Sequence, residues 1–395
     1  MGFSETLVTV VMPVFDGMPW LEETVASVAA QRGVEIQPIA VDDGSTDGSA
    51  DLLRRRGWKV LSTDRVGPNV ARATALAAAE GELVAFLDQD DLWHPEHLAL
   101  AAGTLAAMPS AGAAVARRIP FFGRRRPRLG GSCPGHSTFD PWAVYPANLI
   151  DTPSMVVVRR SALEAAGGWP ADRTLGSDPL LWWRLSAGSP LAIAPRRTVG
   201  VRRSECSLSS VSRDRPLVYL DHLLVAARDA LTHAPVGESE SFAAYGERVL
   251  AAVYRLVAAV GDGSGIAAAA EDLEEALCVS SDAMVIATVG FCGWLMAPQL
   301  WWSRRPVVDP VAAVIDGWPT TARRTRTAAL RMVASVAGPW RTSGLALESP
   351  LSPHRLTVAG AAWAFAGVER WGRVADPLDL RFDRRPWRRK EGPSS

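Results

Sequence analysis

The sequence lacks an excess of charge of either sign. Its 42 lysines and arginines balance its 42 aspartates and glutamates, so the formal net charge at pH 7 is zero. A chain without a positive field has no overall electrostatic attraction for nucleic acid. We therefore expect no nucleic-acid partner, and any argument from charge has to rest on local clusters.

Cysteine is also scarce. The four cysteines, at positions 133, 206, 278 and 292, form neither a CxxC pair nor a zinc-binding spacing. Disulfide frameworks and structural zinc sites both need cysteines in such patterns. The amino terminus has no basic stretch before its first apolar run, so it does not have the form of a secretory signal. These two features favour a cytoplasmic protein without structural disulfides.

Apolar residues, by contrast, are abundant. They make up 48% of the 395 residues, which is enough to bury a large core and is more usual for two domains than for one. The composition changes near Pro216, after which alanine, valine and leucine recur at helical spacing over 216–231 and 242–260, followed by the stretch AEDLEEALCV. We predict an α/β domain over 1–215, a helical region of unknown role over 216–380 and a flexible basic tail over 381–395.

Short apolar runs alternate with helix-period segments in the first half of the chain. This alternation is typical of an α/β fold with a mostly parallel central sheet and flanking helices. The predicted strands are Leu7–Val14, Ile36–Val41, Trp58–Leu61 and Glu82–Phe86. The predicted helices between them are Trp20–Ala30, Ser49–Arg55 and Val70–Ala79.

Aspartates follow three of these strands directly. They are Asp16 after the first strand, Asp42 and Asp43 after the second, and Asp88, Asp90 and Asp91 after the fourth. Parallel strands place such ends on one edge of the sheet, where open α/β folds bind ligands. Converging carboxylates are unfavourable unless a cation or hydrogen-bond donors neutralise them. The pattern therefore predicts a divalent metal and a polar ligand.

The stretch FLDQDDLWHP carries the sharpest signal. A D-x-D carboxylate cluster can hold a hard divalent ion that bridges the oxygens of a diphosphate. Alternatively, Asp91 or a neighbour caps a helix that begins near Pro95, but one cap does not account for three carboxylates. The other acidic stretch, VDDGSTDGSADLLRR, is not an EF-hand loop, because Arg54 stands where the twelfth, bidentate acid would have to be.

Several motifs in order resemble family-2 glycosyltransferases, which have the Rossmann-like GT-A fold. VTVVMPVFDG resembles the first strand of that family, VDDGSTDGS its nucleoside-binding turn, GPNVARATALAAAEGELVAFLDQDD its approach to the metal motif and LWHPEHL the following helix. NLIDTPSMVVVRRSALEAAGGWP and SDPLLWWRL continue the likeness, which fades after VRRSECSLSS. It covers roughly half of the chain, and an ordered series of motifs is far more specific than any one alone.

The resemblance implies a role for each acidic residue after the second and fourth strands. Asp43 would contact the nucleobase, and Asp88 would lie near the donor ribose and diphosphate. Asp90 would coordinate the metal, Mg²⁺ or Mn²⁺, with Asp91 beside it.

The remaining donor-binding residues follow from the same likeness. They are Pro13, Phe15, Asp16, Asp42, Arg72, Arg202 and Arg203. Two positions depart from the family pattern, because Asp16 and Ala73 stand where asparagines are common. For Arg202 and Arg203, predicted to contact the diphosphate, a solvated basic turn is an equal alternative.

The resemblance also implies that Asp178 is the catalytic base. The family has a Glu-Asp pair at a helix start, and here Ser177 replaces the glutamate. A carboxylate in the first turn is held ionised by the helix dipole and can accept a proton from an acceptor hydroxyl. The alternative is that Asp178 only caps the helix before Pro179.

Membrane contact is suggested by three segments, each with a simpler alternative. The arginine-rich stretch 117–128 could meet anionic lipid or a lipid-linked acceptor, or it is a solvated loop. The uncharged segment 283–303 has a length near that of a membrane span, but a buried or interfacial helix is favoured because glycine and proline interrupt it. The basic tail is consistent with the inner face of the cell membrane. His94 and His97 are expected at the surface.

These observations predict an inverting, metal-dependent glycosyltransferase. Its donor would be a UDP-, GDP- or dTDP-linked sugar, and its acceptor a hydroxyl in glycan, cell-envelope or glycosylated-metabolite synthesis. A sugar-1-phosphate nucleotidyltransferase is a weaker alternative, because the glycine-rich RxxPxT-type start is missing. A non-catalytic nucleotide-sugar-binding subunit of a polysaccharide-synthesis complex remains open, given Ser177 and Ala73.

Overall fold

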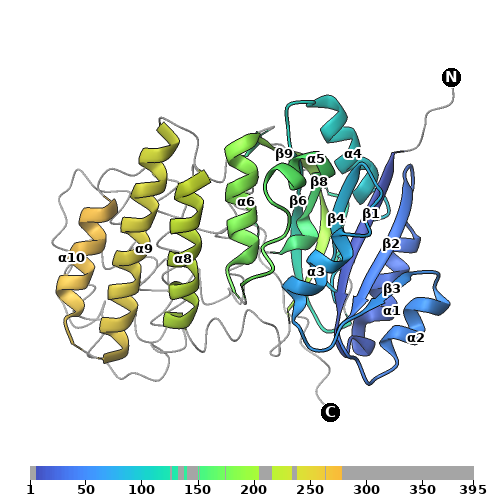
Figure 1. Ribbon diagram of the computed structural model, residues 1–395, viewed down its shortest axis with the longest axis horizontal. Coiled ribbons are helices and arrows are strands. Elements are labelled where there is room, and N and C mark those ends of the chain that lie inside the picture. Colours follow the sequence, from blue (N-terminus) through green and yellow to red (C-terminus); the bar gives the residue numbers. More distant parts are fainter. Residues whose placement is uncertain are drawn as a thin grey trace, which may run out of the picture.

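The computed structural model shows an α/β sheet domain with three further helices packed along one side of it (Figure 1). The residues that the structure describes are 6–124, 127–131, 138–139, 150, 152–173, 175–203, 216–233, 238–262 and 264–277. The predicted membrane segment 283–303 and the tail 381–395 therefore lie outside the described residues.

The first four strands form a parallel sheet, as predicted. They lie in the order β3-β2-β1-β4, so β2 and β3 extend the sheet on one side of β1 and β4 pairs with the other side of β1. The strands are β1 Leu7–Val14, β2 Glu35–Asp42, β3 Lys59–Ser62 and β4 Leu83–Phe86. The helices that connect them are α1 Met18–Ala29, α2 Ser49–Arg55 and α3 Pro68–Leu76.

The sheet continues past β4 in a different style. From β4 the order runs β8-β6-β9-β5, with β7 also on β9, and all of these pairs except β6–β9 are antiparallel. The added strands are β5 Leu92–Trp93, β6 Ala113–Phe122, β7 Thr138–Phe139, β8 Val156–Arg159 and β9 Leu191–Arg203. The nine-stranded sheet is therefore mixed, with its parallel half at the amino-terminal side.

Helices cover the second half of the sheet. They are α4 His97–Ala107, α5 Arg160–Ala165 and α6 Ser177–Gly188, together with a short 3-10 helix over Pro153–Met155. Beside α6 stand α8 Pro216–His233, α9 Glu238–Asp262 and α10 Ile266–Leu277 (Figure 1). The helical character predicted after Pro216 is thus present in the described part of that region. No helix within the described ranges is both long enough and apolar enough to span a membrane.

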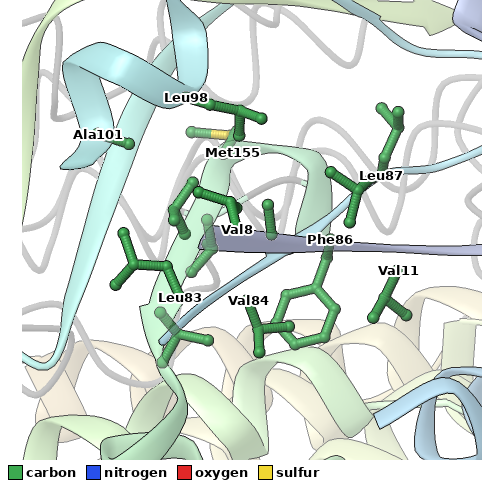
Figure 2. Close-up of a cluster of buried hydrophobic side chains, with 14 of the residues drawn as sticks. Val8, Val11, Leu83, Val84, Phe86, Leu87, Leu98, Ala101 and Met155 are labelled. Atoms are coloured by element: carbon green, nitrogen blue, oxygen red, sulfur yellow. The ribbon is translucent and has the colours of Figure 1, made fainter. Parts of the chain in front are cut away.

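The core forms where β1 and β4 pass between the covering helices. Figure 2 shows Val8 and Val11 of β1 beside Leu83, Val84 and Phe86 of β4, with Leu98 and Ala101 of α4 closing one side. Each large side chain buried in this way stabilises the fold by roughly 1.5–3 kcal/mol relative to exposure. The core thereby fixes the end of β4, from which the acidic loop begins.

Two expectations about surface residues are wrong. His97 lies at the start of α4 with only 1% of its surface exposed, stacked on Trp93 with ring centroids 4.6 Å apart. Arg117 and Arg118, the first two arginines of the basic stretch, are buried within β6 at 3% and 8% exposure. His97 is buried because α4 packs on the sheet, and the two arginines are buried because β6 is an inner strand of the sheet.

Candidate active site

The carboxyl ends of β1, β2 and β4 meet at one edge of the sheet. Val14 pairs with Asp42 across the first two strands, and Val11 pairs with Phe86 across β1 and β4. The loops that carry Asp16, Asp43 and Asp88 therefore begin side by side, as predicted for parallel strands.

The loop after β1 is tied to both neighbouring loops. The side-chain amide of Gln89 accepts from the Phe15 amide at 2.9 Å and donates to the Phe15 carbonyl at 3.0 Å. Asp16 has a left-handed φ of 44°, and its carboxylate accepts a hydrogen bond from the Thr46 amide at 2.8 Å. A Cβ at residue 17 would lie 2.8 Å from the Gln89 side-chain oxygen, so a side chain there would displace Gln89. The three loops thus form one rim.

The loop after β2 uses its two aspartates differently. Asp43 is buried and accepts hydrogen bonds from the Thr63 hydroxyl at 2.8 Å and from the amides of Val66 and Gly67 at 2.9 and 2.7 Å. Asp42 is 8% exposed, and its Oδ1 atom has no hydrogen-bond partner within the described ranges. A buried acceptor without a donor is unfavourable, so Asp42, unlike Asp43, has an oxygen whose hydrogen bonding is not satisfied.

Asp88 is held by residues from two other elements. Its Oδ1 accepts from Arg72 Nη2 of α3 at 2.5 Å, and its Oδ2 accepts from the Thr152 hydroxyl at 2.9 Å. Its amide donates to the Ser154 hydroxyl at 3.0 Å. Arg72 in turn lies over the Trp169 ring, with its Cζ 4.7 Å from the ring centre. These contacts fix the orientation of the Asp88 carboxylate at the edge of the sheet and leave part of its surface exposed.

Asp91 is turned into the protein. It is 2% exposed, and its carboxylate accepts from the Arg202 amide at 3.0 Å and from the Thr152 hydroxyl at 3.2 Å. Burial, and then the nearby charges of Asp90 and Asp88, raise the pKa of Asp91 well above its usual range. This geometry differs from the expected placement beside the metal and leaves Asp88 and Asp90 as the half-buried carboxylates of the motif.

Arg202 is also placed differently from the expectation. Its side chain is fully buried, and it donates to the Asp90 carbonyl at 2.9 Å, to the Gly123 carbonyl and to Glu23 Oε2 at 3.0 Å. Its Cζ lies 4.1 Å from the ring centre of Trp20. All three nitrogens of the guanidinium are used within the protein, so Arg202 holds the acidic loop instead of facing a diphosphate. Arg203 ends β9, and its side chain is outside the described residues.

The donor set fits a cation that is shared with a ligand. Among the residues that the structure describes, no group of three or more His, Cys, Asp or Glu side chains is arranged to hold a metal ion. A magnesium-type ion usually takes one or two protein carboxylates and completes its coordination with phosphate oxygens and water. Asp88 and Asp90 supply hard oxygen ligands of this kind, and they lie close enough to Asp91 to raise its pKa. The residues therefore fit Mg²⁺ or Mn²⁺ bound together with a diphosphate, and not a closed protein cage.

Asp178 lies in the first turn of α6, which begins after Gly176 in a left-handed conformation with φ 76°. One helical turn later, Trp182 packs against Phe86 with ring centroids 6.4 Å apart. Because residues four apart share a helix face, Asp178 lies on the side of α6 that faces the end of β4. Trp182 and Trp183 are both buried, so they pack α6 against the rest of the domain.

A continuous set of hydrogen bonds joins the start of α6 to Asp88. The Asn69 side chain donates to the Arg173 carbonyl at 2.8 Å and accepts from the indole of Trp169 at 3.0 Å and from Arg72 Nη1 at 3.3 Å. Arg72 then pairs with Asp88. The loop before Asp178 and the acidic loop are therefore parts of one connected site.

Sequence reasoning missed the residues that organise this site. These are Asn69, Gln89, Thr152, Ser154 and Trp169. Each has at least one hydrogen-bond partner that lies 60 or more residues away. The only local signal was their place inside motifs that the family resemblance had already marked.

The fold is that of the GT-A class. The crystal structure of S. aureus TarS residues 1–349 in complex with UDP-GlcNAc superposes with a TM-score of 0.50 at 17% identity, covering 92% of each chain. Residues 9–167 match the family model described as glycosyl transferase family 2. The sequence of this stretch is thus similar to that family.

Two relatives support the assignment over shorter stretches. TuaG of Bacillus subtilis, named for teichuronic acid biosynthesis, is 40% identical over 98 residues, which cover 23% of this chain and 39% of TuaG. The succinoglycan biosynthesis protein ExoW of Rhizobium meliloti is 37% identical over 99 residues, which cover 23% of this chain and 31% of ExoW. The matched part is thus well under half the length of either relative.

Proposed function

We propose that the protein is an inverting glycosyltransferase that moves a sugar from a nucleoside-diphosphate sugar to an acceptor hydroxyl. The observation that carries the proposal is the connected set of contacts from Asp88 through Arg72 and Asn69 to the loop before Asp178. It joins a diphosphate-binding edge to a carboxylate suited to proton transfer. The names of TuaG and ExoW favour a glycan or cell-envelope product.

The donor would lie along the edge formed by β1, β2 and β4. The unpartnered oxygen of Asp42 would accept a hydrogen bond from the nucleoside, and Phe15, which is 40% exposed, follows β1, the strand next to β2. Asp88 and Asp90 would hold Mg²⁺ or Mn²⁺, which stabilises the negative charge on a departing diphosphate. The UDP-GlcNAc bound by TarS makes a UDP-sugar the first donor to test.

Asp178 would act as the general base. Its place in the first turn of α6 favours the ionised carboxylate, because the helix amino terminus carries a partial positive charge. The carboxylate accepts the proton of the acceptor hydroxyl while the oxygen forms a bond to the anomeric carbon. The bond from that carbon to the diphosphate breaks on the opposite face, so the configuration inverts.

A second candidate function is nucleotide-sugar binding without transfer. It is favoured by Ser177, which is 2% exposed where the family resemblance calls for a glutamate, and by the three hydrogen bonds that Asp43 accepts from residues 63–67. This candidate needs the donor edge but not the base.

Titration calorimetry with UDP, GDP and dTDP, with and without Mn²⁺, tests the donor edge. We expect one nucleotide to bind in a metal-dependent manner in the wild type and in Asp178→Asn, and that dependence to be lost in Asp90→Asn. Asp51→Asn, an exposed carboxylate on α2, is the control and should bind like the wild type.

Release of the nucleoside diphosphate from the matching sugar donor tests turnover. Loss of a general base lowers the rate by roughly 10²–10⁴-fold, so Asp178→Asn should bind the nucleotide but turn over at that reduced rate. Full activity of Asp178→Asn would remove Asp178 from the mechanism. Binding without turnover in the wild type, across an acceptor screen, would favour the binding function instead.

A further inference from the structure

The first helix of the carboxyl-terminal region, α8, packs directly on the start of α6 (Figure 1). A Cβ added at Gly176 would lie 3.4 Å from the His222 carbonyl oxygen and 3.8 Å from Leu223. Gly176 also has a left-handed φ of 76°, which a side chain would strain. The backbone conformation thus favours glycine at the residue that precedes α6, and α8 packs against this residue at van der Waals distance.

A single carboxylate on α8 holds the two ends of this segment. Asp229 Oδ2 accepts from Arg173 Nη2 at 2.9 Å, and Asp229 Oδ1 accepts from Arg184 Nη2 at 2.6 Å. The three side chains are 25%, 10% and 17% exposed, so the pairs are largely shielded from water. Burial raises the pKa of Asp229, but hydrogen bonds and charge from Arg184 and Arg173 outweigh it and lower the pKa below its usual range.

Asp178 lies between the two arginines that Asp229 binds. Arg173 precedes α6 in the loop whose carbonyl accepts from Asn69, and Arg184 lies on α6 itself. Asp229 therefore restrains the loop on one side of Asp178 and the helix on the other. Arg173, which Asp229 binds, is also hydrogen-bonded to Asn69. Asn69 in turn binds Arg72, and Arg72 pairs with Asp88.

We propose that Asp229 is a positioning residue for glycosyl transfer, through which the helical region sets the location of Asp178 relative to the donor. The inference rests on the proposed function of Asp178. It gives α8 a role that extends beyond covering the sheet domain, because the carboxylate acts on the segment that carries the base.

Other ion pairs of the helical region provide a comparison. Arg228, the neighbour of Asp229 on α8, pairs with Glu247 of α9 at 2.8 Å. Arg255 of α9 pairs with Asp272 of α10, also at 2.8 Å. Both pairs join helices of the carboxyl-terminal region to one another. Loss of either affects how these helices pack together but removes no contact with the segment 173–184.

Steady-state kinetics of Asp229→Asn and Asp229→Ala, with Glu247→Ala as the matched control, test the proposal. Small displacements of a reacting group lower rates by up to about 100-fold, so we expect kcat of the Asp229 variants to fall by roughly 10- to 100-fold. The KM for the donor should change less than kcat, because Asp229 binds Arg173 and Arg184 directly and reaches Arg72 only through Asn69. Asp229→Glu, which keeps the charge, should recover part of kcat, and Glu247→Ala should keep all of it.

Hydrogen exchange of the peptide spanning 173–180 provides a readout that does not depend on activity. We expect faster exchange there in Asp229→Asn than in the wild type or in Glu247→Ala, measured on folded protein with a single unfolding transition. Unchanged exchange, or an equal fall of kcat in Glu247→Ala, would overturn the proposal.

The two measurements separate this proposal from the proposed function. If Asp178→Asn is fully active, Asp178 is not the base, and the exchange data still decide whether Asp229 restrains its segment. If Asp178→Asn is inactive while Asp229→Asn is fully active with unchanged exchange, the base stands and the positioning role fails.

Discussion

The acidic loops after β2 and β4 are built in opposite ways. Asp43 in the first loop binds the hydroxyl and amides of residues 20 to 24 positions further along the chain. In the second loop, Asp88 and Asp91 bind Thr152, 64 and 61 positions away, and Arg202 reaches Asp90 and Asp91 from more than 110 positions away. One loop is stabilised within its own βαβ unit, whereas the other depends on the antiparallel half of the sheet.

The difference explains which carboxylates are available to a ligand. Three short-range donors bind the two oxygens of Asp43, so this carboxylate serves the local fold. Long-range partners instead hold the backbone of the second loop and bury Asp91, and they leave Asp88 and Asp90 with exposed surface at the edge. Partners from distant parts of the chain hold the second loop, so its like charges can stay close together. The first loop, which is held by its neighbours in the chain, does not need to bring several like charges together.

Among the variants that test this comparison, Arg202→Ala should lower the free energy of unfolding most. Removing one partner of a buried ion pair destabilises a protein by about 3–5 kcal/mol, because Glu23 and the Asp90 carbonyl lose their donor. Urea unfolding followed by tryptophan fluorescence measures the change. The matched control is Arg196→Ala on the same strand, whose exposed pair with Glu96 should contribute at most about 1 kcal/mol. Equal losses in the two variants would contradict the role given to Arg202.

Asp43→Asn should have a smaller effect that stays local. The variant replaces one acceptor oxygen by an NH₂ group facing the Gly67 amide or its neighbours, and a buried unsatisfied group costs about 1–3 kcal/mol. Metal-dependent nucleotide binding should weaken through the displaced 63–67 loop, whereas Asp64→Asn, an exposed neighbour, should leave stability and binding unchanged. Calorimetry and urea unfolding report both quantities. An effect confined to nucleotide binding would show that Asp43 serves the ligand and not the loop.

His97 should make the stability of the antiparallel half of the sheet sensitive to acid. Burial, with the nearby charge of His94, lowers the pKa of His97 to about 3, and its Nδ1 lies 2.8 Å from the Thr198 hydroxyl of β9. The unfolded chain takes up a proton there below about pH 6.5, whereas the folded protein stays neutral, so the free energy of unfolding falls as the pH is lowered through this window. The expected loss between neutral pH and pH 5 is about 2 kcal/mol.

The slope of stability against pH is the measurement, because it separates titration from packing. The variant His97→Phe keeps a ring against Trp93 but cannot titrate. Its free energy of unfolding should therefore fall by about 2 kcal/mol less between pH 7 and pH 5 than that of the wild type. An unchanged slope would mean that another group, and not His97, senses the acid.

The parallel half of the fold could be predicted closely from the sequence. The bounds of β1 and α2 agree with the prediction to the residue, and β2, β3 and β4 agree to within two residues at either end. Alternating apolar and helical periods are local signals, and parallel connections leave few possible orders for the strands. For the same reason the meeting of Asp16, Asp42 and Asp88 at one edge was predictable.

The antiparallel half and its polar residues were harder to predict from the sequence. Arg117, Arg118 and His97 were expected at the surface because a charged or polar side chain normally lies there, and only their placement in β6 and α4 buries them. The inward turn of Asp91 and the fully buried Arg202 likewise depend on partners more than 100 residues apart. No pattern within a window of the sequence contains such partners.

The burial of Arg202 has a consequence for the order in which the parts of the sheet domain fold. The parallel strands β1 to β4 can pair as soon as the first 86 residues have left the ribosome, since a chain folds from its amino terminus during synthesis. The acidic loop that follows them keeps its negative charges without their long-range partners until β9 has been synthesised and has docked. The site is therefore the last part of the sheet domain to mature, although its sequence is among the first to emerge.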